Sequence, residues 1–128
     1  MTVEIESLVR NQDLNDLYAS AKVVVGDTLC PGFRKPYYWS DRVYETIGRG
    51  GFLIHPYIEG MDDEFEDGKH LRYYAYQDFA ELKSLINYYI SHDDERRQIA
   101  SAGQGFVREN CTYQDRLKAA FEVMGYEL

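Results

Sequence analysis

The stretch YWSDRVYETIGRGGFLIHP, residues 38–56, decides the fold that we predict for this chain. We interpret it as a loop, a short helix over about 41–48, a glycine-rich turn and a buried strand over about 52–55. Ser40 or Asp41 can cap the start of the helix, since each side chain can accept a backbone N–H bond. The helix also begins where its first N–H groups can point at an anion.

The side chains of this stretch indicate which way it faces. Val43 and Ile47 stand one helical turn apart and can face a core. Three glycines then stop the helix, because glycine takes the left-handed conformation at little cost: Gly48, Gly50 and Gly51. The apolar run over 52–54 is of the kind that a parallel sheet buries. Glu45, next to Arg42 on the helix, is either half of a surface pair or part of a polar pocket.

The composition limits the partners of the chain. Its 128 residues form one domain, 1–128, and are enough to bury a core. The 22 acidic residues outnumber the 14 Lys and Arg, which gives a net charge of -8. This balance argues against DNA or RNA, whose binding needs basic side chains to neutralise phosphates. A local basic cluster can still bind one nucleotide.

Cysteine usage and hydropathy indicate the compartment. Cys30 and Cys111 have neither metal-ligand nor disulfide spacing, so we expect two reduced thiols and no metal site. No apolar run approaches the length of a membrane span, and the N-terminal residues lack a signal-peptide pattern. We therefore expect a cytoplasmic protein. The 12 tyrosines are expected mostly at core edges, with partners for their hydroxyls.

Strand and helix patterns alternate on both sides of the opening stretch. Alternating apolar and charged residues predict a strand over 3–8, and a helix follows from Asp13. Three consecutive valines predict a strand over 22–27 that is buried on both faces. Downstream, we expect a turn with a short acidic helix over 59–65 and a further strand over 70–74.

The last third is predicted to be helical. Helices begin at Asp78, Asp93 and Thr112, and Gly103 and Gly105 are expected to weaken or bend the second. In the second helix, Ile99, Ala102, Phe106 and Val107 are expected to face inward. The first helix repeats apolar residues at helical spacing, and the last one carries a further set: Phe79, Leu82, Leu85, Ile86 and Tyr89, then Tyr113, Leu117, Ala120, Phe121 and Met124. The whole pattern predicts an α/β fold: a Rossmann-like parallel sheet of about four strands, flanked by helices, with a helical C-terminal third.

Polar residues gather where the predicted strands end. Ligands of such sheets bind beyond the carboxyl ends of the strands, and Asp27, the loop 28–41, His55 and the segment 59–62 all fall there. Of the three histidines, His55 is the best placed. The chain has no phosphate-binding loop, zinc-protease motif or nucleophile elbow, so the catalytic residues stay unassigned.

Several segments together resemble one enzyme family. RVYETIGRGGFLI (42–54), Glu59-Gly60, FEDGK (65–69) and the helix from Asp78 resemble the C-terminal, donor-binding half of GT-B glycosyltransferases. Within these, the chain is most similar to the spore-maturation, CgeB-like subgroup. The motif E-x-x-G-x-G-G-F, which begins at Glu45, is the most specific part. The resemblance extends from about residue 3 to residue 124, and Thr112-Tyr113 with Arg116 also fit it.

The resemblance implies a nucleotide-sugar donor, such as a UDP- or GDP-sugar, and no metal. Glu45 would hold the ribose, since a carboxylate accepts two hydrogen bonds from a vicinal diol. Arg42, Arg34 and Lys35 would offset the charge of the diphosphate. The other donor-binding candidates are Ser40, His55, Glu59, Gly60 and Met61. Two alternatives stay open: Glu45 can simply pair with Arg42 or Arg49, and Arg34 and Lys35 can belong to a solvated loop.

The chain also departs from this family pattern. Many GT-B enzymes carry a second glutamate eight residues before the ribose glutamate, where this chain has Tyr37. Two strand–helix units that precede the strand over 3–8, and the acceptor-binding N-terminal half, are missing. We therefore expect a piece of a larger enzyme or a natural remnant, without turnover of its own. The strand over 3–8 can pair with 23–26, leave the sheet or pair with another chain, which would give a homo-oligomer.

Two other functions remain as alternatives. The first is a non-catalytic nucleotide-binding or assembly module built on the same half-fold. The second is a phosphoacceptor receiver domain, which matches the length and the alternation but needs a cluster of acids after its first strand. A thermal shift with UDP or GDP that vanishes on Glu45→Ala would support the glycosyltransferase.

Overall fold

The computed structural model describes residues 11–28, 30 and 32–126. Its elements, in chain order, are α1 (Asn11–Ser20), β1 (Val24–Val25), α2 (Arg42–Gly48), β2 (Leu53–Pro56), the 3-10 turn η1 (Met61–Asp63), β3 (Arg72–Tyr74), α3 (Phe79–Ser91), α4 (Asp93–Asn110) and α5 (Tyr113–Val123). The strand predicted over 3–8 lies outside the described residues.

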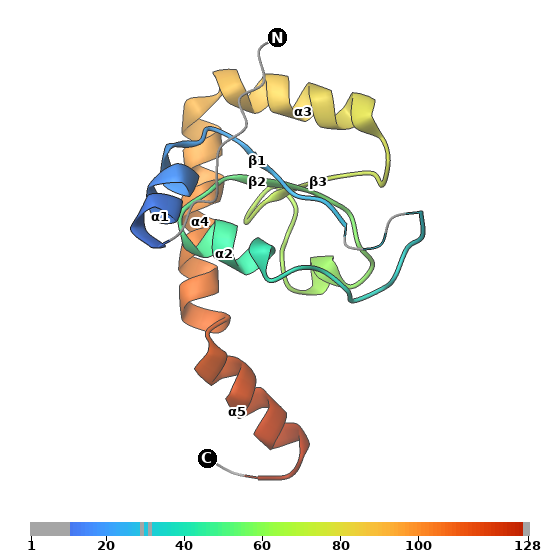
Figure 1. Cartoon of the computed structure of the whole chain (residues 1–128), viewed down its shortest axis with the longest axis vertical. Coiled ribbons are helices and arrows are strands. Elements are labelled where there is room, and N and C mark those ends of the chain that lie inside the picture. Colours follow the sequence, from blue (N-terminus) through green and yellow to red (C-terminus); the bar gives the residue numbers. More distant parts are fainter. Residues whose placement is uncertain (1–10, 29, 31, 127–128) are drawn as a thin grey trace.

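The three described strands form one parallel sheet in the order β1-β2-β3. Val24 lies opposite Leu53, and Ile54 lies opposite Arg72. Helices α2 and α3 lie on opposite sides of this sheet (Figure 1). The prediction of a Rossmann-like α/β fold with a helical C-terminal third is therefore confirmed. The described sheet has three strands, where the sequence predicted about four.

The core has two halves, one on each face of the sheet, and β2 belongs to both. On the first face, Leu53 and Tyr73 pack with Val43 and Ile47 of α2. On the second face, Ile54 packs in a cluster that the side chains Phe52, Tyr74, Tyr89 and Ile99 complete. Every residue of β2 is buried, as the apolar run over 52–54 predicted.

Strand β1 differs from its prediction. Burial on both faces was expected, but the Val25 side chain is 46% exposed and Val24 is only partly buried. The reason is the position of β1 at one edge of the described sheet. Helix α3 packs over the central strand β2, so it leaves Val25 uncovered.

The predicted helix caps are confirmed at α2, α3 and α5, but the cap predicted at Asp13 is wrong, because Asp13 lies inside α1, which begins at Asn11. At α2 the cap is Ser40, whose Oγ accepts the Arg42 N–H at 3.2 Å, whereas the Asp41 side chain makes no capping bond. Asp78 caps α3 by accepting the Glu81 N–H at 3.0 Å. Thr112 and Asp115 form a reciprocal capping box at α5. These local signals set where the helices begin.

Gly103 has a different role from the bend predicted for it. Helix α4 runs unbroken from Asp93 to Asn110, and Gly103 is buried in its middle. A Cβ atom there would lie 2.6 Å from the carbonyl oxygen of His70 and 2.9 Å from Cγ2 of Ile47. Gly103 therefore allows α4 to approach the sheet and α2 closely. Ala102, predicted to face inward, is exposed because its neighbour Gly103 takes the buried position.

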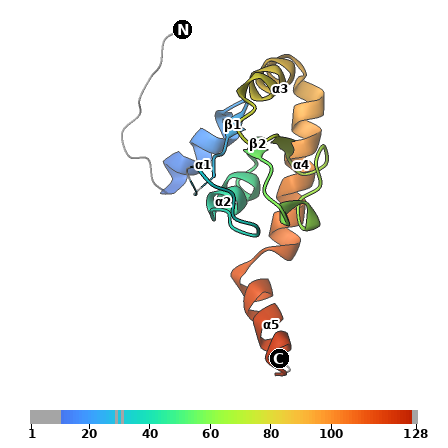
Figure 2. The same ribbon diagram turned by 90° about the vertical axis from the view of Figure 1, so that its right-hand side faces the viewer.

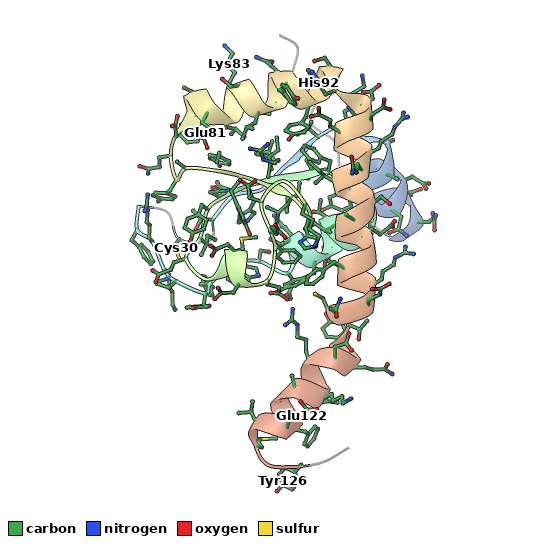
Figure 3. All side chains as sticks on the ribbon, turned by 180° about the vertical axis from the view of Figure 1, so that it is seen from behind. Cys30, Glu81, Lys83, His92, Glu122 and Tyr126 are labelled. Atoms are coloured by element: carbon green, nitrogen blue, oxygen red, sulfur yellow. The ribbon has the colours of Figure 1, made fainter. Side chains whose placement is uncertain are left out.

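Helix α5 extends away from the rest of the molecule in two perpendicular views (Figures 1 and 2). None of its residues is buried, and Tyr113 is 90% exposed. Glu122 and Tyr126 lie near its far end (Figure 3). No described element buries the apolar residues that the sequence places on this helix. Phe79, the first residue of α3, is also exposed.

Within the part of the chain that the structure covers, we find no helix with the length and the apolar content that a membrane crossing requires.

Candidate functional site

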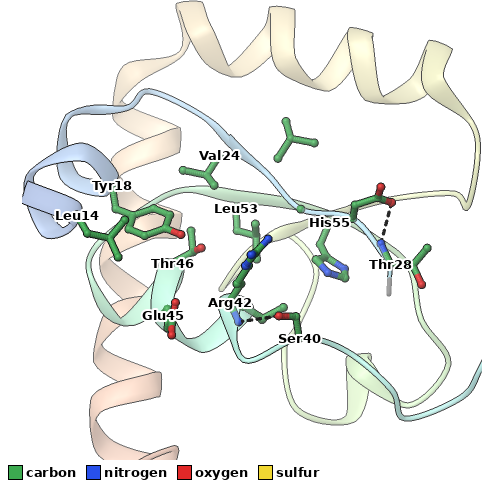
Figure 4. A pocket seen from close by; sticks show the side chains of 14 residues that line it. Leu14, Tyr18, Val24, Thr28, Ser40, Arg42, Glu45, Thr46, Leu53 and His55 are labelled. Atoms are coloured by element: carbon green, nitrogen blue, oxygen red, sulfur yellow. Dashed lines mark hydrogen bonds between the residues drawn. The ribbon is translucent and has the colours of Figure 1, made fainter. Parts of the chain in front are cut away.

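A cavity of about 680 Å³ lies beside β1 and β2, between α1 and α2 (Figure 4). We call it the first cavity. Its lining residues come from both helices, from β2, and from β1 with the segment that follows it: Leu14, Tyr18, Val24, Val25, Gly26, Asp27, Thr28, Ser40, Arg42, Val43, Glu45, Thr46, Leu53 and His55. The cavity reaches the carboxyl ends of two parallel strands, where the sequence predicted a ligand site.

Four of the nine predicted donor-binding residues line the first cavity: Ser40, Arg42, Glu45 and His55. Glu45 is exposed, and it also lines a groove on the other side of α2. Among the described residues, neither Arg42 nor Arg49 forms an ion pair with Glu45. The alternative of a simple surface pair is therefore not what the structure contains. The carboxylate remains available to a ligand at the rim of the cavity.

The start of α2 has fewer free backbone N–H groups for an anion than its position predicts. The Arg42 N–H is bonded to Ser40 Oγ at 3.2 Å, and the Val43 N–H is bonded to the Ser40 carbonyl at 3.1 Å. Two of the first amides of the helix thus already have partners within the chain. The guanidinium of Arg42 is the group that remains for an anion at this end of the cavity (Figure 4).

His55 contributes a neutral ring to the cavity wall. It is 1% exposed, and its Nδ1 lies 2.8 Å from the Pro56 carbonyl oxygen, so Nδ1 must carry the proton. Burial lowers the pKa of His55, although the Pro56 carbonyl and the charge of Asp27 partly oppose this effect. Gly26 makes room for the ring, since a Cβ there would lie 2.5 Å from Cδ2. The other ring nitrogen, Nε2, is then an acceptor.

The lowered pKa of His55 predicts a pH dependence of stability. The unfolded chain takes up a proton below the ordinary histidine pKa of 6.5, while the folded chain resists it until a lower pH. The free energy of unfolding should therefore fall as pH drops below about 6.5. In His55→Asn this fall should be smaller, though not absent, because burial also lowers the pKa of His70. Urea midpoints at pH 7.5 and pH 5.5 measure the effect, and an unchanged fall in His55→Asn would contradict it.

A second cavity, of about 290 Å³, adjoins the first at Thr28. Arg34, Lys35 and Glu59 line it, together with Thr28, Pro36, Tyr57, Ile58 and Tyr76. The Arg34 guanidinium lies 4.9 Å from the centre of the Tyr76 ring, and Lys35 Nζ lies 4.8 Å from that of Tyr38. In the described part of the chain, neither cation forms an ion pair. The two basic residues predicted to act with Arg42 thus belong to a neighbouring cavity.

The remaining two candidates line neither cavity. Met61 is 0% exposed and lies in the hydrophobic core beneath η1, so its side chain cannot reach a ligand. Gly60 allows a close approach, as predicted, but the group that approaches is the ring of Tyr37. A Cβ on Gly60 would lie 2.2 Å from Cε1 of that ring. Of the candidates in the turn 59–62, only Glu59 lines a cavity.

A groove of about 450 Å³ lies between α2 and the junction of α4 with α5. Beside it, Glu64 accepts a hydrogen bond from Tyr44 Oη at 2.8 Å and forms an ion pair with Arg116. Burial, together with the hydrogen bond to Glu64, raises the pKa of Tyr44 to about 12. Burial and the charge of Glu64 raise the pKa of Cys111 to about 11. Both Cys111 and Cys30 are thiols without a disulfide, as predicted.

The sequence as a whole matches one protein family. The family model described as "Glycosyl transferase-like" covers residues 2–122. The chain belongs to the glycosyl transferase-like family. This membership argues against the receiver-domain alternative. No curated protein matches the sequence of the chain.

Solved glycosyltransferase structures share the fold of this glycosyl transferase-like chain. Anabaena Alr3699/HepE in complex with UDP-glucose aligns with a TM-score of 0.73 at 17% identity, over 91% of this chain and 31% of that one. The same protein with UDP gives 0.71 at 17% identity, with the same coverage. A glycosyltransferase from Rickettsia africae gives 0.70 at 16% identity, over 88% and 29%. The chain thus spans less than a third of each of these structures.

Sequence reasoning missed part of the lining of the first cavity. Tyr18 and Thr46 face it, and no motif marks them, whereas Asp27 was expected at the end of its strand. The one available signal was the spacing of Leu14 and Tyr18, which places both on one face of α1. Across the described ranges, no group of three or more His, Cys, Asp or Glu side chains is placed to hold a metal ion.

The other two histidines have structural roles. His70 is buried, accepts the Glu66 N–H at Nδ1 over 3.1 Å and stacks on Phe106. His92 stacks on Tyr88 at the exposed junction of α3 and α4. Neither residue lines a cavity described above.

Proposed function

We propose that this chain is the donor-binding part of a GT-B glycosyltransferase of the CgeB-like subgroup, and that it holds a nucleotide-sugar for glycosyl transfer. The observation that carries the proposal is the unpaired carboxylate of Glu45 on the wall of a 680 Å³ cavity in a glycosyl transferase-like chain. The titles of the HepE structures name UDP-glucose and UDP as ligands, which supports a uridine nucleotide as the first ligand to test.

Each wall of the first cavity suits one part of a nucleoside. Glu45 accepts hydrogen bonds from the two ribose hydroxyls. The Tyr18 ring and Leu14 give the apolar wall that a flat base needs. The neutral ring of His55 offers Nε2 as an acceptor. Ser40 fixes the start of α2, and through it the position of Arg42.

The diphosphate and the sugar would extend toward the second cavity. Arg42 contacts the phosphate nearest the ribose, and Arg34 and Lys35 contact the negative charge beyond Thr28. Glu59, in the same cavity, is placed to accept hydrogen bonds from sugar hydroxyls. We expect these cations to offset the diphosphate charge without a metal ion.

The role of Arg42 predicts a difference between two ligands. In Arg42→Gln the affinity for UDP should fall about tenfold, since a hydrogen bond to a charged group contributes about 1.5 kcal/mol or more. The affinity for uridine, which has no phosphate, should stay the same. Isothermal titration of both ligands in a buffer with EDTA measures this, with the exposed residue change Arg97→Gln as the matched control. Equal losses for UDP and uridine would count against a phosphate contact.

A non-catalytic nucleotide-binding module remains the second candidate. The feature that favours it is Tyr37, which stands where many GT-B enzymes carry a second glutamate that contacts the donor sugar. We propose that 1–128 folds as one domain and binds the donor, while turnover needs an acceptor-binding half. Release of glucose from UDP-glucose by the chain alone would contradict this division. Pairing of the 3–8 strand with another chain stays a prediction.

A further inference from the structure

Tyr37 has an unusual backbone conformation in the loop that carries Arg34 and Lys35. Its φ angle is +58°, in the left-handed region that residues with a Cβ atom enter at a cost in energy. The surrounding contacts must therefore hold it there. Such positions concentrate at ligand-binding sites, where the neighbouring structure enforces the conformation.

Three contacts fix Tyr37 to the turn after β2. Its N–H donates to the Glu59 carbonyl at 2.9 Å. Its ring lies directly on Gly60, where any Cβ would collide with the ring atoms. Its hydroxyl lies 3.4 Å from Asp63 Oδ2. The outer side of the ring faces solvent, since Tyr37 is 66% exposed. Through the three contacts, Tyr37 connects two segments that lie far apart in the chain.

Tyr37 shapes the second cavity without lining it. Pro36 and Lys35, next to Tyr37 in sequence, make one wall, and Ile58 and Glu59 make the other. The bond from the Tyr37 N–H to Glu59 joins these two walls directly. Without the contacts of Tyr37, the wall that carries Lys35 would no longer be held against Glu59.

We propose that Tyr37 is a positioning residue. It holds the loop that carries Arg34 and Lys35 against the 59–63 turn and thereby shapes the second cavity for the glycosyl end of the donor, that is, the sugar of the nucleotide-sugar. The inference rests on the proposed function. The size of the cavity supports this assignment: about 290 Å³ is at the lower limit of ligand pockets, which span roughly 300–1,000 Å³. It suits one sugar ring with an attached phosphate group.

The test compares two ligands on three variants of the full chain. Tyr37→Ala removes the ring and its hydroxyl, whereas Tyr37→Phe keeps the ring on Gly60 and loses only the hydroxyl. Tyr113→Ala, at the most exposed tyrosine of α5, is the matched control. Affinities for UDP and UDP-glucose are measured by isothermal titration. In parallel, the rate of tryptic cleavage after Arg34 reports whether the loop is held.

In Tyr37→Ala, the affinity for UDP-glucose should fall at least about tenfold, as expected when a wall that orients a ligand is released. The affinity for UDP should fall by less, up to about threefold, since only its outer phosphate reaches Arg34 and Lys35 in the second cavity. Cleavage after Arg34 should become faster, because a released loop is open to protease. Tyr37→Phe should restore most of the UDP-glucose affinity, and Tyr113→Ala should match the unaltered chain in every measurement.

Four results would overturn the inference. If UDP and UDP-glucose lose affinity equally in Tyr37→Ala, the residue supports folding and has no role at the glycosyl end. If cleavage after Arg34 is unchanged, Tyr37 does not hold the loop. If the unaltered chain binds neither ligand, the proposed function fails and the positioning role fails with it. By contrast, normal binding of both ligands by the unaltered chain and by Tyr37→Ala would defeat the inference alone.

Discussion

Replacing Glu45 with alanine should lower the affinity of the chain for UDP by about 30-fold, which corresponds to about 2 kcal/mol. In the proposed complex the carboxylate accepts hydrogen bonds from both ribose hydroxyls, and each bond to a charged acceptor contributes about 1.5–3 kcal/mol. We expect less than the sum of the two, because Glu45 is exposed and water competes for both partners.

A second ligand makes the Glu45 experiment specific. The unaltered chain should prefer UDP over 2′-deoxy-UDP, which lacks one of the two hydroxyls, and Glu45→Ala should bind both ligands equally. Glu122→Ala, on α5 and far from the cavity (Figure 3), serves as the control and should keep the full preference. A preference for UDP that survives in Glu45→Ala would rule out the ribose contact.

Replacing Gly103 with alanine should lower the free energy of unfolding by about 2 kcal/mol. The added Cβ would meet the His70 carbonyl oxygen at 2.6 Å and Cγ2 of Ile47 at 2.9 Å. The carbonyl belongs to the backbone and cannot rotate away, so α4 must move outward. Overpacking costs about 1–3 kcal/mol or more, which exceeds the gain of about 1 kcal/mol from replacing glycine within a helix.

Gly105 provides a matched control in the same helix. Nothing lies within 4 Å of a Cβ built there, so Gly105→Ala should raise the free energy of unfolding by up to about 1 kcal/mol. Urea denaturation of the two variants gives both values. Shifts of the same sign would show that helix propensity, and not the close approach at Gly103, decides the outcome.

Signals that act over a few residues predicted much of the fold. The caps at Asp78 and Thr112, the end of α2 at Gly48 and the buried run over 52–54 depend on neighbours in sequence, so the sequence alone reveals them. The exposure of Val25 was not predictable in this way. It depends on which strand lies at the edge of the sheet, and that is a property of the assembled layers.

The location of the candidate site was predictable, but the division of its residues between two cavities was not. The carboxyl ends of parallel strands collect ligand-binding residues in any fold of this class, so His55 could be named in advance. Glu45 was named through the resemblance to GT-B enzymes. The division of Arg42 from Arg34 and Lys35 into two cavities could not be foreseen. It depends on the path of the loop 28–41, which Tyr37 fixes through contacts with a distant turn. Met61 faces the core for a similar reason, since the orientation of η1 is set by its packing.

Because α5 is isolated from the other described elements, α5 and the sheet domain should unfold with very different cooperativity. An 11-residue helix is marginal in water on its own, and this one adds almost no apolar burial to the sheet domain. Its helical state must therefore depend on its capping box and on the tie from Arg116 to Glu64. Melting of α5 can then precede global denaturation and leave the first cavity intact. The last turns of the chain should therefore unfold locally, at a lower free energy than the sheet domain.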